Sequence, residues 1–177
     1  MYKKQKLLLV EDQACFALSL KTFLSNYAND IKVVGIAENG KIGSALADKL
    51  KPDVILMDVR MPVMDGISAV KAIKPAHPDI KIVMLSTYDE DEFVREALLA
   101  GASGYLLKDT SPTELIISIR ALSTGITLIS PDIARDLVRK KYVDHKKENG
   151  EHNMQYLDEL TKQERETFAL LATGYNN

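Results

Sequence analysis

Acidic, hydroxyl and basic residues come directly at the ends of four short apolar runs in this chain. They are Glu11 and Asp12 after one run, Asp58 after another, Ser86 at the end of a third, and Lys108 after a fourth. If the runs are parallel strands, their carboxyl ends meet at one edge of the sheet and these side chains converge. Three close carboxylates repel by roughly 4 kcal/mol per pair at about 4 Å and an effective dielectric near 20. Such a cluster needs a cation, and its all-oxygen ligands favour Mg²⁺.

Asp58 is the candidate acceptor of a phosphoryl group at this edge. Lys108 could give the outer phosphoryl oxygens a positive charge and Ser86 a hydroxyl donor. The chemistry implied is phosphoryl transfer to a carboxylate. Taken alone, Asp58 could be a turn residue that ends a strand, which is common for aspartate. A structural ion pair of Glu11 and Asp12 with Lys108 would explain the charges, but neither the hydroxyl nor Asp58.

Short apolar runs alternate with helical patterns along the chain, which predicts βαβ units and an α/β fold. The expected strands are 7–10, 33–37, 54–57, 80–86 and 103–107. The expected helices are 13–27, one after Asn39-Gly40 that runs through Ile42, Leu46 and Leu50, 66–73, 91–100 and one that starts at the capping box Ser111-Pro112-Thr113-Glu114. The run 54–57 does not alternate with polar residues, so both faces of this strand should be covered. It belongs to the stretch Lys51 to Gly66, in which the apolar run leads into Asp58 and a proline-containing loop follows.

Composition allows one full domain and an incomplete additional part. The chain has 177 residues, of which 46% are hydrophobic, and a formal net charge of −2. That charge gives no overall attraction to nucleic acid or to a membrane. The apolar run 7–10 is too short for a signal peptide or a spanning helix, so we expect a cytoplasmic protein with no membrane partner. Cys15 is expected to be a buried structural thiol, and His77 to be a surface residue.

The C-terminal part differs in character from the rest. Ser130-Pro131 is expected to open a further helix, and residues 140–158 are rich in charged and polar residues, which is typical of a linker. Thr161 and Glu164 form another capping box ahead of the apolar residues Phe168 and Leu171. A helix of this kind cannot bury its apolar face alone, so we expect it to be a fragment of a larger unit.

Four motifs carry a resemblance to a known family. LLLVED, DVILMDVRMPVMDG, IVMLSTYDEDE and GASGYLLKD stand in the order and at the intervals of a receiver domain. The chain resembles a two-component response regulator of the NarL/FixJ type over about residues 6–138. The resemblance resumes at LTKQERETFALLATGYNN, which is similar to the start of a LuxR-type helix-turn-helix domain. Four motifs in register are far more specific than any one of them.

The resemblance implies the fold and the division of the chain. The implied fold is the flavodoxin-like or CheY-like (βα)5 receiver, a five-stranded parallel sheet in the order 2-1-3-4-5, with a C-terminal helical extension. We expect a receiver domain at residues 1–128 and a helix with a charged linker at 129–159. Residues 160–177 would be the truncated start of a LuxR-type DNA-binding domain.

The resemblance also implies a role for each residue that matches a motif. Asp58 is the phosphoacceptor, and Ser86 and Lys108 bind the phosphoryl group. The implied Mg²⁺ ligands are Glu11, Asp12, Asp58 and the backbone carbonyl of Arg60. Ser86 and Tyr105 form the switch. The protein would be no enzyme apart from slow self-dephosphorylation. One departure is Asp109, where many receivers have a proline in a cis peptide.

The implied partners are a sensor histidine kinase and, after phosphorylation, a second copy of the chain. DNA would be bound only through the missing part of the C-terminal domain, so we expect this chain not to bind DNA specifically. One alternative is a stand-alone receiver or phosphate sink. An aspartate-nucleophile phosphatase is disfavoured, because Asp58-Val59-Arg60 lacks the second carboxylate of that class. A flavodoxin-like cofactor binder is disfavoured by Glu11 and Asp12, which would repel a phosphate.

Overall fold

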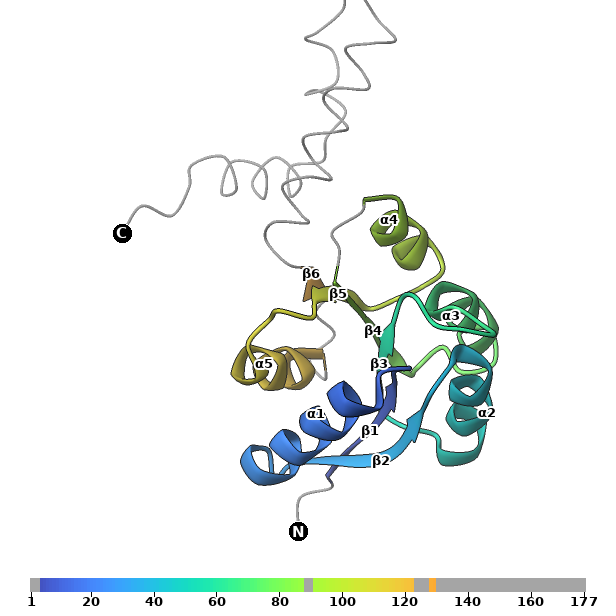
Figure 1. The fold of residues 1–177 in the computed structure, drawn as a ribbon. Helices are drawn as coiled ribbons and strands as arrows, with labels where there is room; N and C mark the ends of the chain where they lie inside the picture. Colours follow the sequence, from blue (N-terminus) through green and yellow to red (C-terminus); the bar gives the residue numbers. More distant parts are fainter. Residues whose placement is uncertain (1–3, 88–90, 123–127, 130–177) are drawn as a thin grey trace, which may run out of the picture. The chain divides into compact units, whose positions relative to one another are not determined.

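Parallel strands form a sheet in the order β2-β1-β3-β4-β5-β6 at the centre of the fold (Figure 1). The computed structural model describes residues 4–87, 91–122 and 128–129. The strands are β1 (Gln5–Val10), β2 (Ile31–Ala37), β3 (Val54–Asp58), β4 (Lys81–Ser86), β5 (Gly104–Leu107) and β6 (Leu128–Ile129). The helices are α1 (Ala14–Tyr27), α2 (Gly40–Leu50), α3 (Gly66–Ile73), α4 (Asp91–Leu99) and α5 (Pro112–Leu122).

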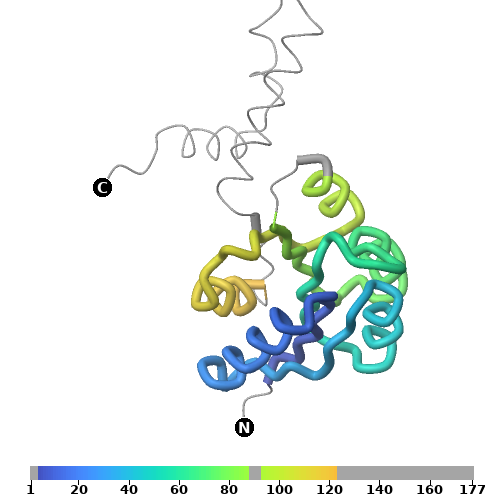
Figure 2. Tube along the Cα trace, viewed as in Figure 1, coloured from blue at the N-terminus to red at the C-terminus, as the bar shows by residue number. Residues whose placement is uncertain are grey.

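The two faces of the sheet bury separate apolar clusters. Successive residues of a strand point to opposite faces. In β3, Val54 and Leu56 pack with α1 and α5, whereas Ile55 and Met57 pack with α2, α3 and α4. The Cα trace in Figure 2 shows this division, with α1 and α5 on one side and the other helices on the opposite side. All four residues are at most 1% exposed, which confirms that both faces of this strand are covered.

Helix starts follow the capping residues in the sequence. The Asn39 side chain accepts a hydrogen bond of 3.0 Å from the Ile42 amide at the start of α2. At α5, the Glu114 amide donates to Ser111 Oγ (3.2 Å) and the Ser111 amide donates to Glu114 Oε2 (3.1 Å). These are the two reciprocal bonds of a capping box. The box predicted at Ser111 is therefore confirmed.

The predicted five-stranded sheet in the order 2-1-3-4-5 is confirmed, and a short sixth strand extends it. β6 pairs in parallel with β5, with Gly104 opposite Leu128 and Tyr105 opposite Ile129. The sequence analysis missed β6 because a strand of two residues has too few positions to show a periodicity. Several other boundaries move by one or two residues; β1, for example, already begins at Gln5.

The expectation for Cys15 was wrong, because its side chain is exposed. In α1 the buried residues are Ala17, Leu20 and Leu24, and Cys15 lies outside the stripe that they form. Apolar neighbours in the sequence suggested burial, but position around the helix decides it. His77 is not a fully exposed surface residue either. It is half-buried, and its Nε2 lies 3.3 Å from Asp48 Oδ1.

The predictions for the helix at Ser130-Pro131, the linker and the start of a helix-turn-helix domain at 160–177 fall outside the described residues. The proposed division at 128 and 159 remains a prediction. Within the ranges that the structure covers, none of the helices is both long and apolar enough to cross a membrane.

Candidate functional site

Three charged side chains come together where β1, β3 and β5 end. Val10 pairs with Met57 across β1 and β3, so Glu11 and Asp58 end neighbouring strands at the same level. If the alternation of each strand continues, Glu11, Asp58 and Lys108 all point to the face that α1 and α5 cover. This common alternation explains why the three side chains meet at one place.

Lys108 bridges the two buried carboxylates. Its Nζ donates a hydrogen bond to Glu11 Oε1 and another to Asp58 Oδ2, each 3.0 Å long. Glu11 Oε2 is also only 2.8 Å from Nζ, but it is buried without a hydrogen bond of acceptable geometry among the described residues. The Lys108 side chain is 8% exposed, so these ion pairs are largely shielded from solvent. Buried charges of this kind need partners, and here each has one.

For both Glu11 and Lys108, burial and ion pairing shift the pKa in opposite directions. Burial raises the pKa of the Glu11 carboxyl, and the hydrogen bonds from Lys108 and from the Gln13 amide offset only part of that effect. For Lys108, burial acts to lower the pKa, but the hydrogen bonds to Glu11 and Asp58 outweigh it and the pKa is raised. Lys108 therefore stays charged at neutral pH.

Glu11, Asp12 and Asp58 form a group that could hold a metal ion. One carboxylate oxygen from each lies within 4.8 Å of the other two. Opposite ligands of an octahedral Mg²⁺ stand about 4.2 Å apart, so the group is close to the required size. Its ligands are all oxygens, and Glu11 Oε2 lacks a hydrogen bond within the described part of the chain. The residues present therefore fit Mg²⁺, with Asp12 exposed and the other two carboxylates buried.

The loop after Asp58 is held against the end of β3. The Gly66 amide donates to the Val59 carbonyl (2.9 Å), which brings the start of α3 next to the strand. A Cβ at Gly66 would overlap the carbonyl oxygen of Asp58 and lie 2.7 Å from Met84 Cε. Only glycine allows this approach. The residue that starts α3 thereby fixes the backbone that carries the candidate acceptor.

Ser86 and Tyr105 lie on the other face of the sheet. Ser86 ends β4 and is 6% exposed, and its carbonyl accepts a hydrogen bond of 2.7 Å from the Lys108 amide. Tyr105 is fully buried in the cluster of α2, α3 and α4. Both predicted switch residues thus lie on the face covered by α2, α3 and α4, and Ser86 contacts the site residue Lys108 through its backbone. The side chain of Arg60, whose carbonyl is a predicted ligand, lies with its Cζ 5.0 Å from the centre of the Phe93 ring in α4.

Phe16 belongs to the surroundings of the site, although in the sequence it is only one of the apolar residues of the helix predicted at 13–27. Lys108 Nζ lies 5.1 Å from the centre of the Phe16 ring. Both residues also line a cavity of about 340 Å³ beside Pro112 and Leu115. An aromatic residue at helical spacing is usually read as core, and nothing in the sequence alone pairs it with Lys108.

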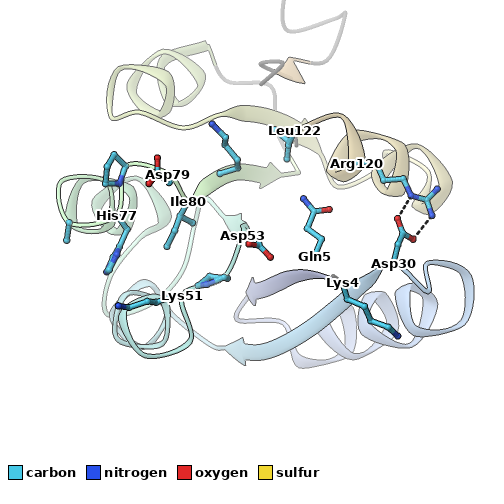
Figure 3. Close-up of a pocket in the computed structure, with 14 residues that line it drawn as sticks. Lys4, Gln5, Asp30, Lys51, Asp53, His77, Asp79, Ile80, Arg120 and Leu122 are labelled. Atoms are coloured by element: carbon cyan, nitrogen blue, oxygen red, sulfur yellow. Dashed lines mark hydrogen bonds and ion pairs between the residues drawn. The ribbon is translucent and has the colours of Figure 1, made fainter. Parts of the chain in front are cut away.

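A larger cavity, of about 780 Å³, lies at the opposite edge of the sheet, where the strands begin (Figure 3). Gln5 and Asp53 are among the residues that line it, and Arg120 pairs with Asp30 at one side (Figure 3). Among the described residues, only Glu11 and its two partners form a group suited to a metal ion, and they lie at the other edge. The chemistry, and not the size of the cavity, therefore locates the candidate site.

Comparisons with known proteins agree with this geometry. Residues 7–120 match the family described as response regulator receiver domain. The chain is 39% identical over 170 residues to the transcriptional regulatory protein YdfI of Bacillus subtilis, covering 96% of this chain and 76% of YdfI. It is 37% identical over 172 residues to the response regulator protein VraR of Staphylococcus aureus, covering 97% of this chain and 78% of VraR.

A solved structure shares the fold. It is the crystal structure of a LuxR-family two-component response regulator from Aurantimonas, with a TM-score of 0.74 and 27% identity. The match covers 79% of this chain and 99% of that one. The residues that match the receiver family, 7–120, include most of β1, all of β2 to β5 and the whole candidate site. The chain therefore belongs to the response regulator receiver family and is a two-component response regulator of the NarL/LuxR type, a family of transcription regulators.

Proposed function

We propose that Asp58 is the phosphoacceptor of this response regulator and that it reacts while Mg²⁺ is held by Glu11, Asp12 and Asp58. The observation that supports this best is the position of the Lys108 ammonium, 3.0 Å from Asp58 Oδ2 at a strand end shared with two more carboxylates. The backbone carbonyl of Arg60 is the proposed fourth protein ligand. Bound there, Mg²⁺ would neutralise charge on the carboxylates and on the incoming phosphoryl oxygens.

The reaction needs little covalent chemistry from the protein. An oxygen of the Asp58 carboxylate attacks the phosphorus of a phosphohistidine or of acetyl phosphate. The bond from phosphorus to the leaving nitrogen or oxygen breaks, its electron pair goes to the leaving group, and an acyl phosphate remains on Asp58. Lys108 contributes a positive charge and Ser86 a hydroxyl donor for the phosphoryl oxygens. Slow hydrolysis of the acyl phosphate would reset the protein.

Ser86 and Tyr105 are the proposed switch. Phosphorylation draws Ser86 toward the phosphoryl group and changes the packing of Tyr105 behind it, which alters the surface of α4, β5 and α5. Tyr105 is already fully buried here, so a change of its surroundings and not its entry into the core would carry the signal. Nuclear magnetic resonance spectra with and without beryllofluoride test this. Unchanged signals for both residues would remove them from the mechanism.

The partners follow from membership of the family. The proposed phosphodonor is a sensor histidine kinase, and the proposed consequences are homodimerisation and control of DNA binding by the C-terminal part of the protein. A fluorescence titration with promoter DNA at physiological salt, with and without phosphorylation, tests the expectation that this 177-residue chain binds no specific site. Nanomolar, sequence-specific binding would contradict it.

Intact-mass measurement after treatment with acetyl phosphate tests the acceptor. We expect one phosphoryl adduct on the unchanged chain in Mg²⁺, and none in EDTA. Asp58→Asn should abolish the adduct. The matched control is Asp79→Asn, which removes an exposed carboxylate at the opposite edge of the sheet and should leave the adduct unchanged. An adduct on Asp58→Asn, or equal labelling in EDTA, would overturn the assignment.

A further inference from the structure

Besides its two carboxylate partners, the Lys108 ammonium contacts an aromatic ring. Glu11 and Asp58 take hydrogen bonds from Nζ, and the centre of the Phe16 ring lies 5.1 Å from the same atom. A cation within about 6 Å of a ring centre is attracted to the negative face of the ring, and more strongly where water is excluded. The Lys108 side chain is 8% exposed, so water is largely excluded from this contact.

A cavity beside Phe16 and Lys108 leaves room for the lysine to move. Phe16 and Lys108 line the cavity of about 340 Å³ between α1 and α5, together with Asp109 and Thr110. Asp109 would offer a flexible ammonium another carboxylate, away from Asp58. A lysine side chain has four rotatable bonds and loses much rotamer freedom when it is held. The two hydrogen bonds and the contact with the Phe16 ring together hold Nζ on the side of Asp58.

We propose that Phe16 is a positioning residue for phosphoryl transfer, whose ring holds the Lys108 ammonium against Asp58 and out of the cavity between α1 and α5. The proposal rests on the proposed role of Asp58 as phosphoacceptor. Phe16 itself touches no reacting atom. It acts through Lys108, and its position on α1 makes the geometry of the site depend on how this helix packs against the sheet.

Three variants separate positioning from packing. Phe16→Leu keeps an apolar side chain but removes the ring, and Phe16→Tyr keeps the ring. Phe23→Leu is the matched control, because Phe23 is another half-buried aromatic residue of α1 that packs on the same cluster and lines the same cavity. Each is measured for its rate of phosphorylation by acetyl phosphate in saturating Mg²⁺, and for its stability in urea.

We expect Phe16→Leu to react about fivefold more slowly than the unchanged protein, as the loss of one cation–π contact implies. Phe16→Tyr should stay within about twofold of the unchanged rate, and Phe23→Leu should not slow the reaction although it destabilises the fold. In a Lys108→Ala background, Phe16→Leu should have no further effect on the rate. Equal slowing by Phe16→Leu and Phe23→Leu, or an effect that persists without Lys108, would overturn the proposal.

A second measurement does not depend on phosphorylation. Protons above the face of an aromatic ring are shifted upfield in proton spectra. The ammonium protons of Lys108 should therefore show an upfield shift that Phe16→Tyr preserves and Phe16→Leu removes. If the unchanged protein gives no adduct on Asp58, the proposed function fails while this shift still decides whether the ring holds the lysine. If the shift is absent, the positioning role fails even when Asp58 is phosphorylated.

Discussion

The ammonium nitrogen of Lys108 lies 3.0 Å from Oδ2 of Asp58, the distance of a direct charge-assisted hydrogen bond. The same nitrogen is 2.8 Å from Glu11 Oε2. Lys108 thus pairs with two of the three carboxylates that would bind Mg²⁺, and its single positive charge offsets only part of their negative charge. The lysine and the metal ion share the same negative charges, and their effects on one another can be measured.

Replacing Lys108 with methionine should tighten Mg²⁺ binding by at least about threefold at pH 8, because a positive charge is removed from beside the ligands. The rate of phosphorylation should fall in the same variant. Isothermal titration calorimetry measures the affinity. Lys71→Met is the control, since Lys71 pairs with Glu96 (3.4 Å) on the surface of α3 and α4. Unchanged or weaker binding in Lys108→Met would show that the lysine does not compete with the ion.

Gly66→Ala should destabilise the protein by about 3 kcal/mol or more, because the new Cβ must displace the backbone of Asp58. The comparison variant is Gly35→Ala, whose Cβ would meet only side-chain methyl groups, Leu50 Cδ1 at 3.0 Å and Leu8 Cδ1 at 3.1 Å. It should cost about 1 kcal/mol or less, since these groups can shift. Urea denaturation measures both. Equal costs would mean that the approach of α3 to Asp58 can relax.

Val63→Gly should stabilise the protein by about 1 kcal/mol. Val63 has a φ of 69°, which a β-branched residue rarely adopts, and it is 80% exposed, so little packing is lost. The Met64 amide donates to the Pro62 carbonyl (2.7 Å) across this tight turn. Lys51, with a φ of 45° at the end of α2, is unbranched, and Lys51→Gly should gain less. A loss of stability in Val63→Gly, seen in urea, would contradict the strain.

Arg120 and Asp30 form a two-bond ion pair, 2.8 and 2.7 Å long, on the surface. The hydrogen bonds from Arg120 lower the pKa of Asp30 below its usual value. A lowered pKa means that the pair stabilises the fold above the usual pKa of aspartate and that the contribution disappears as the pH falls through the lowered value. Arg120→Gln should therefore be slightly less stable than the unchanged protein at pH 6.

The difference should shrink as the pH falls below the usual pKa of aspartate and through the lowered pKa of Asp30. It should also shrink in high salt because exposed charges are screened. Urea titrations at several pH values, with Lys21→Gln as the surface control, measure it. A stability difference that is the same at every pH would show that Arg120 acts through packing.

Much of the fold could be predicted because its determinants are local. The uninterrupted apolar run before Asp58 indicated a central strand, and Ser111 with Glu114 marked the start of a helix that forms the predicted bonds. The convergence of Glu11, Asp58 and Lys108 could be predicted because strand ends in a parallel sheet share one edge. The exposure of Cys15 could not be predicted, since it depends on which side of α1 faces the sheet.

The contact of Phe16 with Lys108 joins residues that are far apart in the sequence and depends on side-chain placement. No spacing rule covers such a pair. Likewise, nothing in the residue type of Val63 predicts its positive φ. The sequence thus indicates which groups meet, but the details that hold them in place come from tertiary packing.

The sixth strand determines at which edge of the sheet the described part of the chain ends. α5 ends at Leu122, which lines the cavity at the edge where the strands begin (Figure 3). β6 runs parallel to β5 and therefore turns back toward the edge of Asp58, with Ile129 opposite Tyr105. Main-chain pairing thus connects the strand of the proposed switch residue to β6, the last described element of the chain. A displacement of β5 would therefore be passed to β6 through these two residue pairs.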